Sequence, residues 1–120
     1  MGRCLIVDDN EEFADNLAEI VRDLGMQAVV ANSGPQALGL LRKNSFHLLL
    51  SDLKMPGMDG AQLIHEALEL QPGLPSVVIT AYGSQHSLER VTREGCVAIL
   101  TKPVQVEHLV PLFETYLVDR

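Results

Sequence analysis

Acidic, hydroxyl and amino side chains end four of the apolar segments of this sequence. Of five such segments, Asp8 and Asp9 follow the first, Asp52 ends the third, Thr80 ends the fourth, and Lys102 comes after the fifth. If these segments are parallel strands of one sheet, the side chains all emerge at one edge, where such sheets bind ligands. Three carboxylates so close together would repel one another unless a cation lay among them. Oxygen ligands with room for water suit Mg²⁺ (or Mn²⁺), so the pattern predicts a metal site at Asp8, Asp9 and Asp52.

The same group of residues could carry out phosphoryl transfer. An aspartate carboxylate can attack phosphorus to form an acyl phosphate, and Asp52 is the candidate nucleophile. Lys102 would supply a positive charge and Thr80 a hydroxyl donor to a transferring phosphoryl group. Ala81, which follows Thr80, is small enough to leave that site open.

Short apolar runs bounded by turn residues predict five strands. The run that ends at Asp52 has no polar alternation, which is typical of a strand covered by helices on both faces. We predict strands at residues 3–7, 28–31, 48–52, 76–80 and 97–100.

Between the strands, apolar residues at three- and four-residue spacings predict five helices. Asp9 or Asn10 can cap the first, which we expect to bury Leu24 and to stop at Gly25. Pro111 should bend the last helix or delay its start. The fourth helix has the sparsest apolar face and should be the least firmly docked. The predicted helices cover about residues 10–24, 34–44, 61–70, 84–94 and 106–117.

Five strands alternating with five helices are typical of the α/β class, with a doubly wound five-stranded parallel sheet and right-handed crossovers. The periodicity leaves the order of the strands open. A length of 120 residues fits one domain, and we expect residues 1–120 to form it.

The composition disfavours several classes of protein. The net charge of −7 argues against direct nucleic-acid binding, which needs clustered Lys and Arg. No apolar run is long enough to span a bilayer and no signal peptide is recognisable, so we expect a cytoplasmic protein without membrane contact. Cys4 and Cys96 are far apart in sequence, and the four histidines lack ligand spacing, so a disulfide or a zinc site is not expected.

The motifs together resemble those of the response-regulator receiver domain of two-component signalling, over essentially the whole chain. The resemblance rests on residues 7–9 (Val-Asp-Asp), on residues 52–60, on residues 80–83 (Thr-Ala-Tyr-Gly) and on residues 102–103 (Lys-Pro). Any one of these motifs alone would be weak, but their joint occurrence in this order is highly specific.

The resemblance implies a flavodoxin-like strand order, 2-1-3-4-5, and Asp52 as the acceptor of a phosphoryl group from a phosphohistidine. The donor would be a histidine kinase or a histidine phosphotransfer domain. The resemblance also implies that Asp9 binds Mg²⁺ directly, Asp8 largely through water, and the Lys54 position through its backbone carbonyl. The peptide bond before Pro103 should be cis, which would aim the lysine into the pocket.

One position departs from the family pattern. The family often has Tyr or Phe three residues before the lysine, a ring that swings inward on activation, and Ile99 stands there. Repacking of Ile99 would have to replace that movement. Lys54 and Tyr82 occupy positions associated in the family with dephosphorylation rate, and Tyr82 could partly screen attacking water.

Two other classes of protein share parts of this sequence pattern. A haloacid-dehalogenase-type phosphatase also uses an aspartyl nucleophile, but it needs a second Asp where Lys54 stands, and 120 residues leave little room for a cap. A flavodoxin-like FMN carrier would need a phosphate loop where Asp8 and Asp9 would repel phosphate. A degenerate receiver that acts only as a docking module is a further alternative. The resemblance implies an output domain or partner of unspecified kind, and a dimer would form through the fourth and fifth helices, which are the family's usual partner surface.

Overall fold

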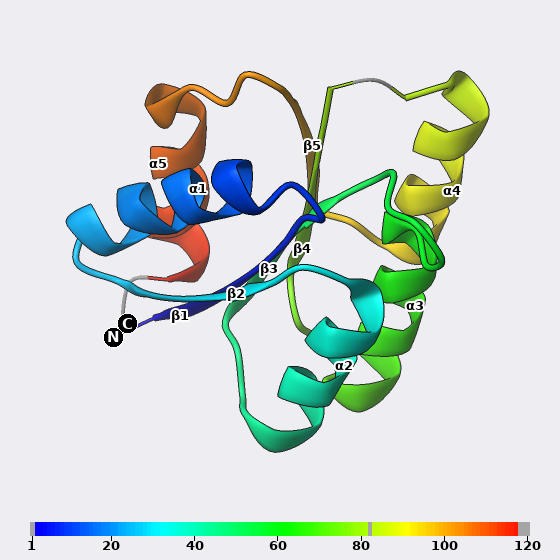
Figure 1. Cartoon of the computed structure of the whole chain (residues 1–120), viewed down its shortest axis with the longest axis horizontal. Helices are drawn as coiled ribbons and strands as arrows, with labels where there is room; N and C mark the ends of the chain where they lie inside the picture. The colour runs from blue at the N-terminus through cyan, green and yellow to red at the C-terminus, as the bar shows by residue number, and fades with distance from the viewer. Residues whose placement is uncertain (1, 82, 118–120) are drawn as a thin grey trace.

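Five parallel strands form one sheet in the order β2-β1-β3-β4-β5. The computed structural model describes residues 2–81 and 83–117, and Figure 1 shows the sheet edge-on between two layers of helices. The strand order agrees with the one implied by the sequence resemblance, and the alternation of strands and helices agrees with the one predicted from the periodicity. The strands are β1 (Arg3–Val7), β2 (Gln27–Ala31), β3 (Leu48–Asp52), β4 (Ser76–Thr80) and β5 (Ala98–Thr101).

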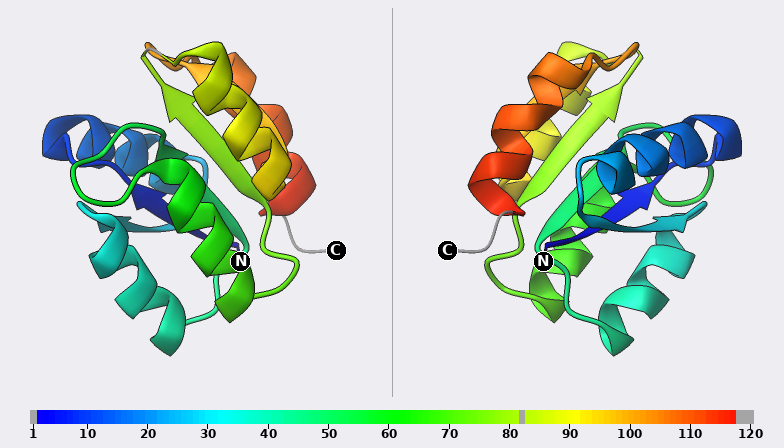
Figure 2. Two further views of the ribbon diagram at one scale, coloured as in Figure 1. Left: turned by 90° about the vertical axis from the view of Figure 1, so that its right-hand side faces the viewer. Right: turned by 90° about the vertical axis from the view of Figure 1, so that its left-hand side faces the viewer.

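The helices cover both faces of the sheet. Helices α1 and α5 lie on one face, and α2, α3 and α4 lie on the other (Figures 1 and 2). This arrangement is that of a doubly wound α/β fold. The helices are α1 (Glu11–Asp23), α2 (Gly34–Lys43), α3 (Gly60–Leu70), α4 (Gln85–Glu94) and α5 (Val106–Tyr116).

Strand β3 lies in the middle of the sheet and contributes to both halves of the core. Leu49 packs in the cluster on the α2–α3–α4 face, whereas Leu48 and Leu50 pack in the cluster on the α1–α5 face. All three side chains are buried, and burial of a leucine side chain contributes about 1.5–3 kcal/mol. The uninterrupted apolar run is therefore explained by two covered faces, and its carboxyl end holds Asp52 in a fixed position.

Side-chain caps fix the start of the four helices that follow the first four strands. Asn10, and not Asp9, caps α1, since its Oδ1 accepts a hydrogen bond from the Phe13 amide at 3.1 Å. The other three caps are Ser33 on α2, Asp59 on α3 and Ser84 on α4. Each cap satisfies an amide that the helix itself leaves without a partner.

Several predicted boundaries were wrong by one residue, among them both ends of α1 and of β5, the start of β2, and one end each of α2, α3, α4 and α5. Helix α1 ends at Asp23, and Leu24 is 40% exposed because it lies at the C-cap, where the chain turns away toward Gly25. Strand β5 begins at Ala98, and Val97 is 47% exposed. Helix α5 begins at Val106 and contains Pro111, so the proline does not delay its start.

The weak docking predicted for α4 agrees with its burial, because Val91 is its one fully buried residue. Across residues 2–81 and 83–117, no helix combines the length and the apolar character needed to span a bilayer.

Candidate phosphoacceptor site

The carboxyl ends of four strands bring the predicted site residues together. Asp8 directly follows β1, Asp52 and Thr80 are the last residues of β3 and β4, and Lys102 directly follows β5. The strands are parallel and the pairings Asp52 with Ile79 and Thr80 with Thr101 are in register. These side chains therefore share one edge of the sheet.

Asp8, Asp9 and Asp52 form a compact carboxylate cluster. One oxygen of each lies within 4.8 Å of the others. Asp8 is 2% exposed, whereas Asp9 is exposed to solvent. Backbone amides orient the two less exposed carboxylates: the Asn10 amide donates to Asp8 Oδ1 at 2.9 Å and the Leu53 amide donates to Asp52 Oδ1 at 2.8 Å.

The Lys102 ammonium enters the cluster from the β5–α5 loop. Its Nζ lies 2.9 Å from Asp8 Oδ2 and 3.4 Å from Asp52 Oδ2, and the side chain is 18% exposed. The Lys102 amide donates to the Thr80 carbonyl at 3.0 Å, which ties the loop to the end of β4. The Lys102–Pro103 peptide bond is cis, as the resemblance implied.

Burial and charge shift two pKa values in this cluster. Burial raises the pKa of Asp52, the charge of Asp8 raises it further, and Lys102 and the Leu53 amide oppose the rise. For Lys102, burial lowers the pKa, but its hydrogen bonds and charge interactions with Asp8 and Asp52 outweigh burial and leave the pKa raised. Lys102 is therefore cationic at neutral pH, and it partly offsets the carboxylate charge.

The loop from β3 to α3 places the nucleophile candidate closely against a helix. The Gly60 amide donates to the Leu53 carbonyl at 2.8 Å, and a Cβ on Gly60 would lie 2.5 Å from the Asp52 carbonyl oxygen. Since this carbonyl is backbone and cannot move cheaply, position 60 requires glycine. Gly57 has φ +83°, in the left-handed region that favours glycine.

The remaining predicted positions surround the cluster. Thr80 is 4% exposed. Ala81 and the Lys54 side chain are exposed, and Ile99 is half-buried against the core on the α2–α3–α4 face. Tyr82 lies outside the described residues.

The carboxylate cluster fits a hard divalent cation. Its donors are oxygens alone, two of them are oriented by backbone amides, and the exposed Asp9 leaves that side open to water. Mg²⁺ prefers one or two carboxylates together with waters and phosphate oxygens. The charge of a divalent ion would also offset the repulsion among the three carboxylates.

Two contacts around the cluster were not predicted from the sequence. Phe13 is one of several apolar residues of α1, yet its ring centroid lies 4.2 Å from Lys102 Nζ. Asn32, which follows β2, donates from Nδ2 to the Asp8 carbonyl at 3.1 Å. The sequence pattern marks Phe13 as a core residue only, because its spacing is that of any apolar helix face.

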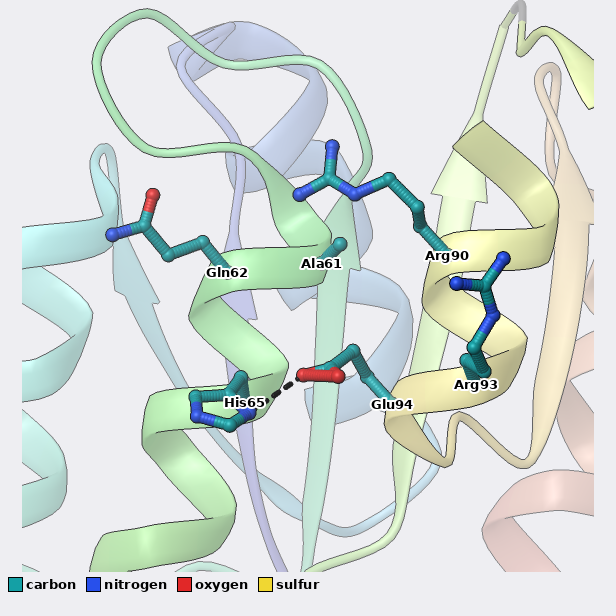
Figure 3. Close-up of a pocket in the computed structure, with 6 residues that line it drawn as sticks. All are labelled: Ala61, Gln62, His65, Arg90, Arg93 and Glu94. Atoms are coloured by element: carbon teal, nitrogen blue, oxygen red, sulfur yellow. Dashed lines mark ion pairs between the residues drawn. The ribbon is translucent and has the colours of Figure 1, made fainter. Parts of the chain in front are cut away.

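A groove of about 330 Å³ between α3 and α4 lies apart from the carboxylate cluster. Figure 3 shows His65 of α3 and Glu94 of α4 pointing toward one another across it, at 2.7 Å. Arg90 pairs with Asp59, the α3 cap, at 3.0 Å. These exposed pairs join α4 to α3, and nothing in them suggests phosphoryl chemistry.

Comparison with known proteins agrees with this geometry. The family model described as the response regulator receiver domain matches residues 4–114. A response regulator receiver protein of Anaeromyxobacter sp. (strain Fw109-5) is 49% identical over 112 residues, which are 93% of this chain and 47% of that protein. The transcriptional regulatory protein GlrR of Escherichia coli (strain K12) is 37% identical over 105 residues, 88% of this chain and 24% of that protein. The chain therefore spans less than half the length of these two relatives.

Solved structures show the same fold. A CheY-like receiver domain of Methanospirillum hungatei JF-1 superposes with a TM-score of 0.91 at 29% identity, over 96% of this chain and 92% of that one. A response regulator of Burkholderia pseudomallei, solved with a phosphorylated aspartic acid, a calcium ion and citrate, gives a TM-score of 0.86 at 30% identity. That match covers 92% of this chain and 65% of the other. With the family model matched over almost the whole length, this chain belongs to the response regulator receiver domain family.

Proposed function

We propose that residues 1–120 form a phosphoacceptor switch of a two-component phosphorelay. The observation that carries the proposal is the position of Asp52, whose Oδ2 lies 3.4 Å from Lys102 Nζ beside the carboxylates of Asp8 and Asp9. The carboxylate is the nucleophile, and the donor is the phosphohistidine of a histidine kinase or of a histidine phosphotransfer domain. The phosphorus–nitrogen bond breaks, an acyl phosphate forms on Asp52, and the imidazole leaves with its bonding electron pair.

Each residue of the site has a proposed task. Asp8, Asp9 and Asp52 hold Mg²⁺ (or Mn²⁺), together with the backbone carbonyl of Lys54. The metal, when bound, neutralises charge on the phosphoryl oxygens. Lys102 contributes a further positive charge from the β5–α5 loop, and the Thr80 hydroxyl donates to the phosphoryl group.

Phosphorylation would act on the rest of the domain through charge. A phosphoryl group adds about −1.5 to −2 charges at Asp52. To move a two-state population from 1:99 to 99:1, the two states must differ by about 5.5 kcal/mol in their interaction with that group. Thr80 and Lys102 are the contacts we expect to differ, with Ile99 repacking where the family often has an aromatic ring. Ala81 and Tyr82 would govern access of water to the acyl phosphate.

The partners follow from this role. The domain receives its phosphoryl group from a histidine-containing protein and presents a changed surface to an output domain or partner, with α4 and α5 as the face for a partner or a dimer. Direct nucleic-acid and membrane contacts are not part of the proposal, and the expected location is the cytoplasm. The domain performs its own phosphoryl acceptance and dephosphorylation and has no other proposed enzymatic activity.

Intact-mass measurement tests the proposal directly. Wild-type protein and Asp52→Asn are incubated with a small-molecule phosphodonor and with a phosphorylated histidine phosphotransfer domain, each with and without Mg²⁺. We expect one added phosphoryl group that requires both Asp52 and Mg²⁺. Asp15→Asn removes an exposed carboxylate of α1 and should be phosphorylated like the wild type. If a rapid-quench measurement finds no adduct on wild type with Mg²⁺, the phosphoacceptor role is wrong and a docking module becomes the better interpretation.

A further inference from the structure

Phe13 places an aromatic ring beside the Lys102 ammonium. Phe13 is the third residue of α1, and its half-buried side chain packs against the core on the α1–α5 face. The ring centroid lies 4.2 Å from Lys102 Nζ. A cation within about 6 Å of a ring centroid is attracted by the negative face of the π system.

The ring and the carboxylates restrain the ammonium together. Nζ lies 2.9 Å from Asp8, 3.4 Å from Asp52 and 4.2 Å from the ring centroid of Phe13. A lysine side chain has a flexible four-carbon stem and loses rotamer freedom when its head is held in one place. The attraction to a ring face is less directional than a hydrogen bond, so it tolerates small movements of Nζ.

The lower directionality of the ring contact matters because the carboxylates must change partners during phosphoryl acceptance. The oxygens of Asp8 and Asp52 that contact Nζ belong to groups that are also the proposed metal ligands and the proposed nucleophile. The Phe13 ring can be neither a metal ligand nor the nucleophile. Its contact with the ammonium is therefore one that the reaction leaves intact.

We propose that Phe13 is a positioning residue for phosphoryl acceptance, whose ring keeps the Lys102 ammonium beside Asp52 while the carboxylate contacts of that ammonium are exchanged. The inference rests on the proposed function, since it assigns Phe13 a part in the same reaction. Ile99 cannot supply such a contact, because it is aliphatic and packs on the other face of the sheet.

Three variants distinguish the effect of the Phe13 aromatic ring from the effect of its side-chain volume. Phe13→Leu keeps an apolar side chain but has no π face, and Phe13→Tyr keeps the ring. Phe46→Leu is the matched control: Phe46 is buried just before β3, at the end of the strand opposite Asp52, and its ring lies 6.0 Å from the guanidinium carbon of Arg3. This control removes a ring and core volume without touching the site.

The first measurement needs no phosphorylation. In NMR spectra of the unphosphorylated, metal-free protein, the ε-methylene protons of Lys102 should be shifted upfield by the ring current of Phe13. The shift should disappear in Phe13→Leu and persist in both Phe13→Tyr and Phe46→Leu. An unshifted Lys102 signal in wild type would overturn the inference.

The second measurement is the rate constant of phosphorylation by a small-molecule donor with Mg²⁺. We expect Phe13→Leu to be slower by about 3- to 30-fold, the range of a partly desolvated cation–π contact, and Phe13→Tyr to stay within about 2-fold of wild type. In a Lys102→Met background, Phe13→Leu should have no further effect, because the residue acts through the ammonium.

The outcomes distinguish the inference from the function on which it rests. A wild type that accepts no phosphoryl group overturns the proposed function. If the wild type does accept a phosphoryl group, any of three results overturns the role of Phe13 alone. These are that Phe13→Leu reacts as fast as the wild type, that it slows the Lys102→Met variant by the same factor as it slows the wild type, or that Phe46→Leu is slowed as much as Phe13→Leu.

Discussion

Asp9→Asn should stabilise the domain when no divalent metal is present. Asp9 contributes a carboxylate oxygen that lies within 4.8 Å of oxygens of both Asp8 and Asp52. The substitution removes a negative charge from this group and keeps the size of the side chain. It should therefore relieve repulsion that the folded state suffers and the unfolded chain largely avoids.

The magnitude follows from the spacing of the cluster. At 4.8 Å, two unit charges interact by about 0.9 kcal/mol in bulk water and about 3.5 kcal/mol at an effective dielectric constant of ~20. Asp9 is exposed, so the lower value applies, and relief from two carboxylates amounts to about 2 kcal/mol. Loss of a negative charge near the start of α1 offsets about 0.3–1 kcal/mol. Loss of the attraction between Asp9 and the Lys102 ammonium, which lies in the same cluster, offsets a further part of the gain. We expect a net gain of up to about 1 kcal/mol, which raises the Tm of a domain of this size by up to about 4 °C.

The assay is thermal and urea unfolding in buffer with a metal chelator. Asp15→Asn, an equal change of charge at an exposed position of the same helix, should shift the Tm little. The gain from Asp9→Asn should shrink at 1 M salt, where the Debye length of about 3 Å is shorter than the separation. Added Mg²⁺ should stabilise the wild type, by about 2.7 kcal/mol at 100 times its Kd, and should stabilise Asp9→Asn much less. A destabilised Asp9→Asn, or a gain that is unchanged at high salt, would refute the electrostatic reasoning.

Four further substitutions test the carboxylate cluster and the helices beside it. The pKa of Asp52 is raised in the folded state, chiefly by burial, so its ionised form lowers the stability of the fold. This loss of stability is absent below the ordinary pKa of an aspartate and is complete above the raised pKa of Asp52. Asp52→Asn should therefore raise the free energy of unfolding at neutral pH and not in acid, as measured by metal-free urea titrations across pH. Gly60→Ala should destabilise the fold by about 1–3 kcal/mol, because its Cβ would meet the Asp52 carbonyl oxygen at 2.5 Å. Gly39→Ala in α2 has open space around it and should stabilise the fold by about 0.5–1 kcal/mol in the same titrations. Arg90→Gln, which removes the exposed pair with Asp59, should cost no more than about 1 kcal/mol.

The fold, and the gathering of the candidate site residues at one edge of the sheet, were predictable because the sequence marks where each strand ends. An apolar run that stops at Asp52 indicates both a buried strand and the edge at which its carboxylate emerges. The same pattern places Asp8, Thr80 and Lys102 at that edge, and the family resemblance adds the order of the strands. Apart from the strand order, these inferences depend on local sequence and on the parallel arrangement.

What could not be predicted depends on how separate elements are oriented. The spacing of Phe13 marks it as apolar helix surface, but the loop after β5 decides that Lys102 meets its ring. The pair formed by His65 and Glu94 depends in the same way on the distance between α3 and α4. Leu24 continues the apolar spacing of α1 and is nevertheless exposed, because the end of a helix is set by its cap rather than by its periodicity.

The described ends of the chain meet at the pole of the molecule opposite the carboxylates. Gly2 lies against the backbone of Leu117, so closely that any side chain at position 2 would collide with it. A polypeptide joined to either end would therefore start at the edge of the sheet opposite Asp8 and Asp52. A fusion at either end should therefore leave the carboxylate cluster undisturbed.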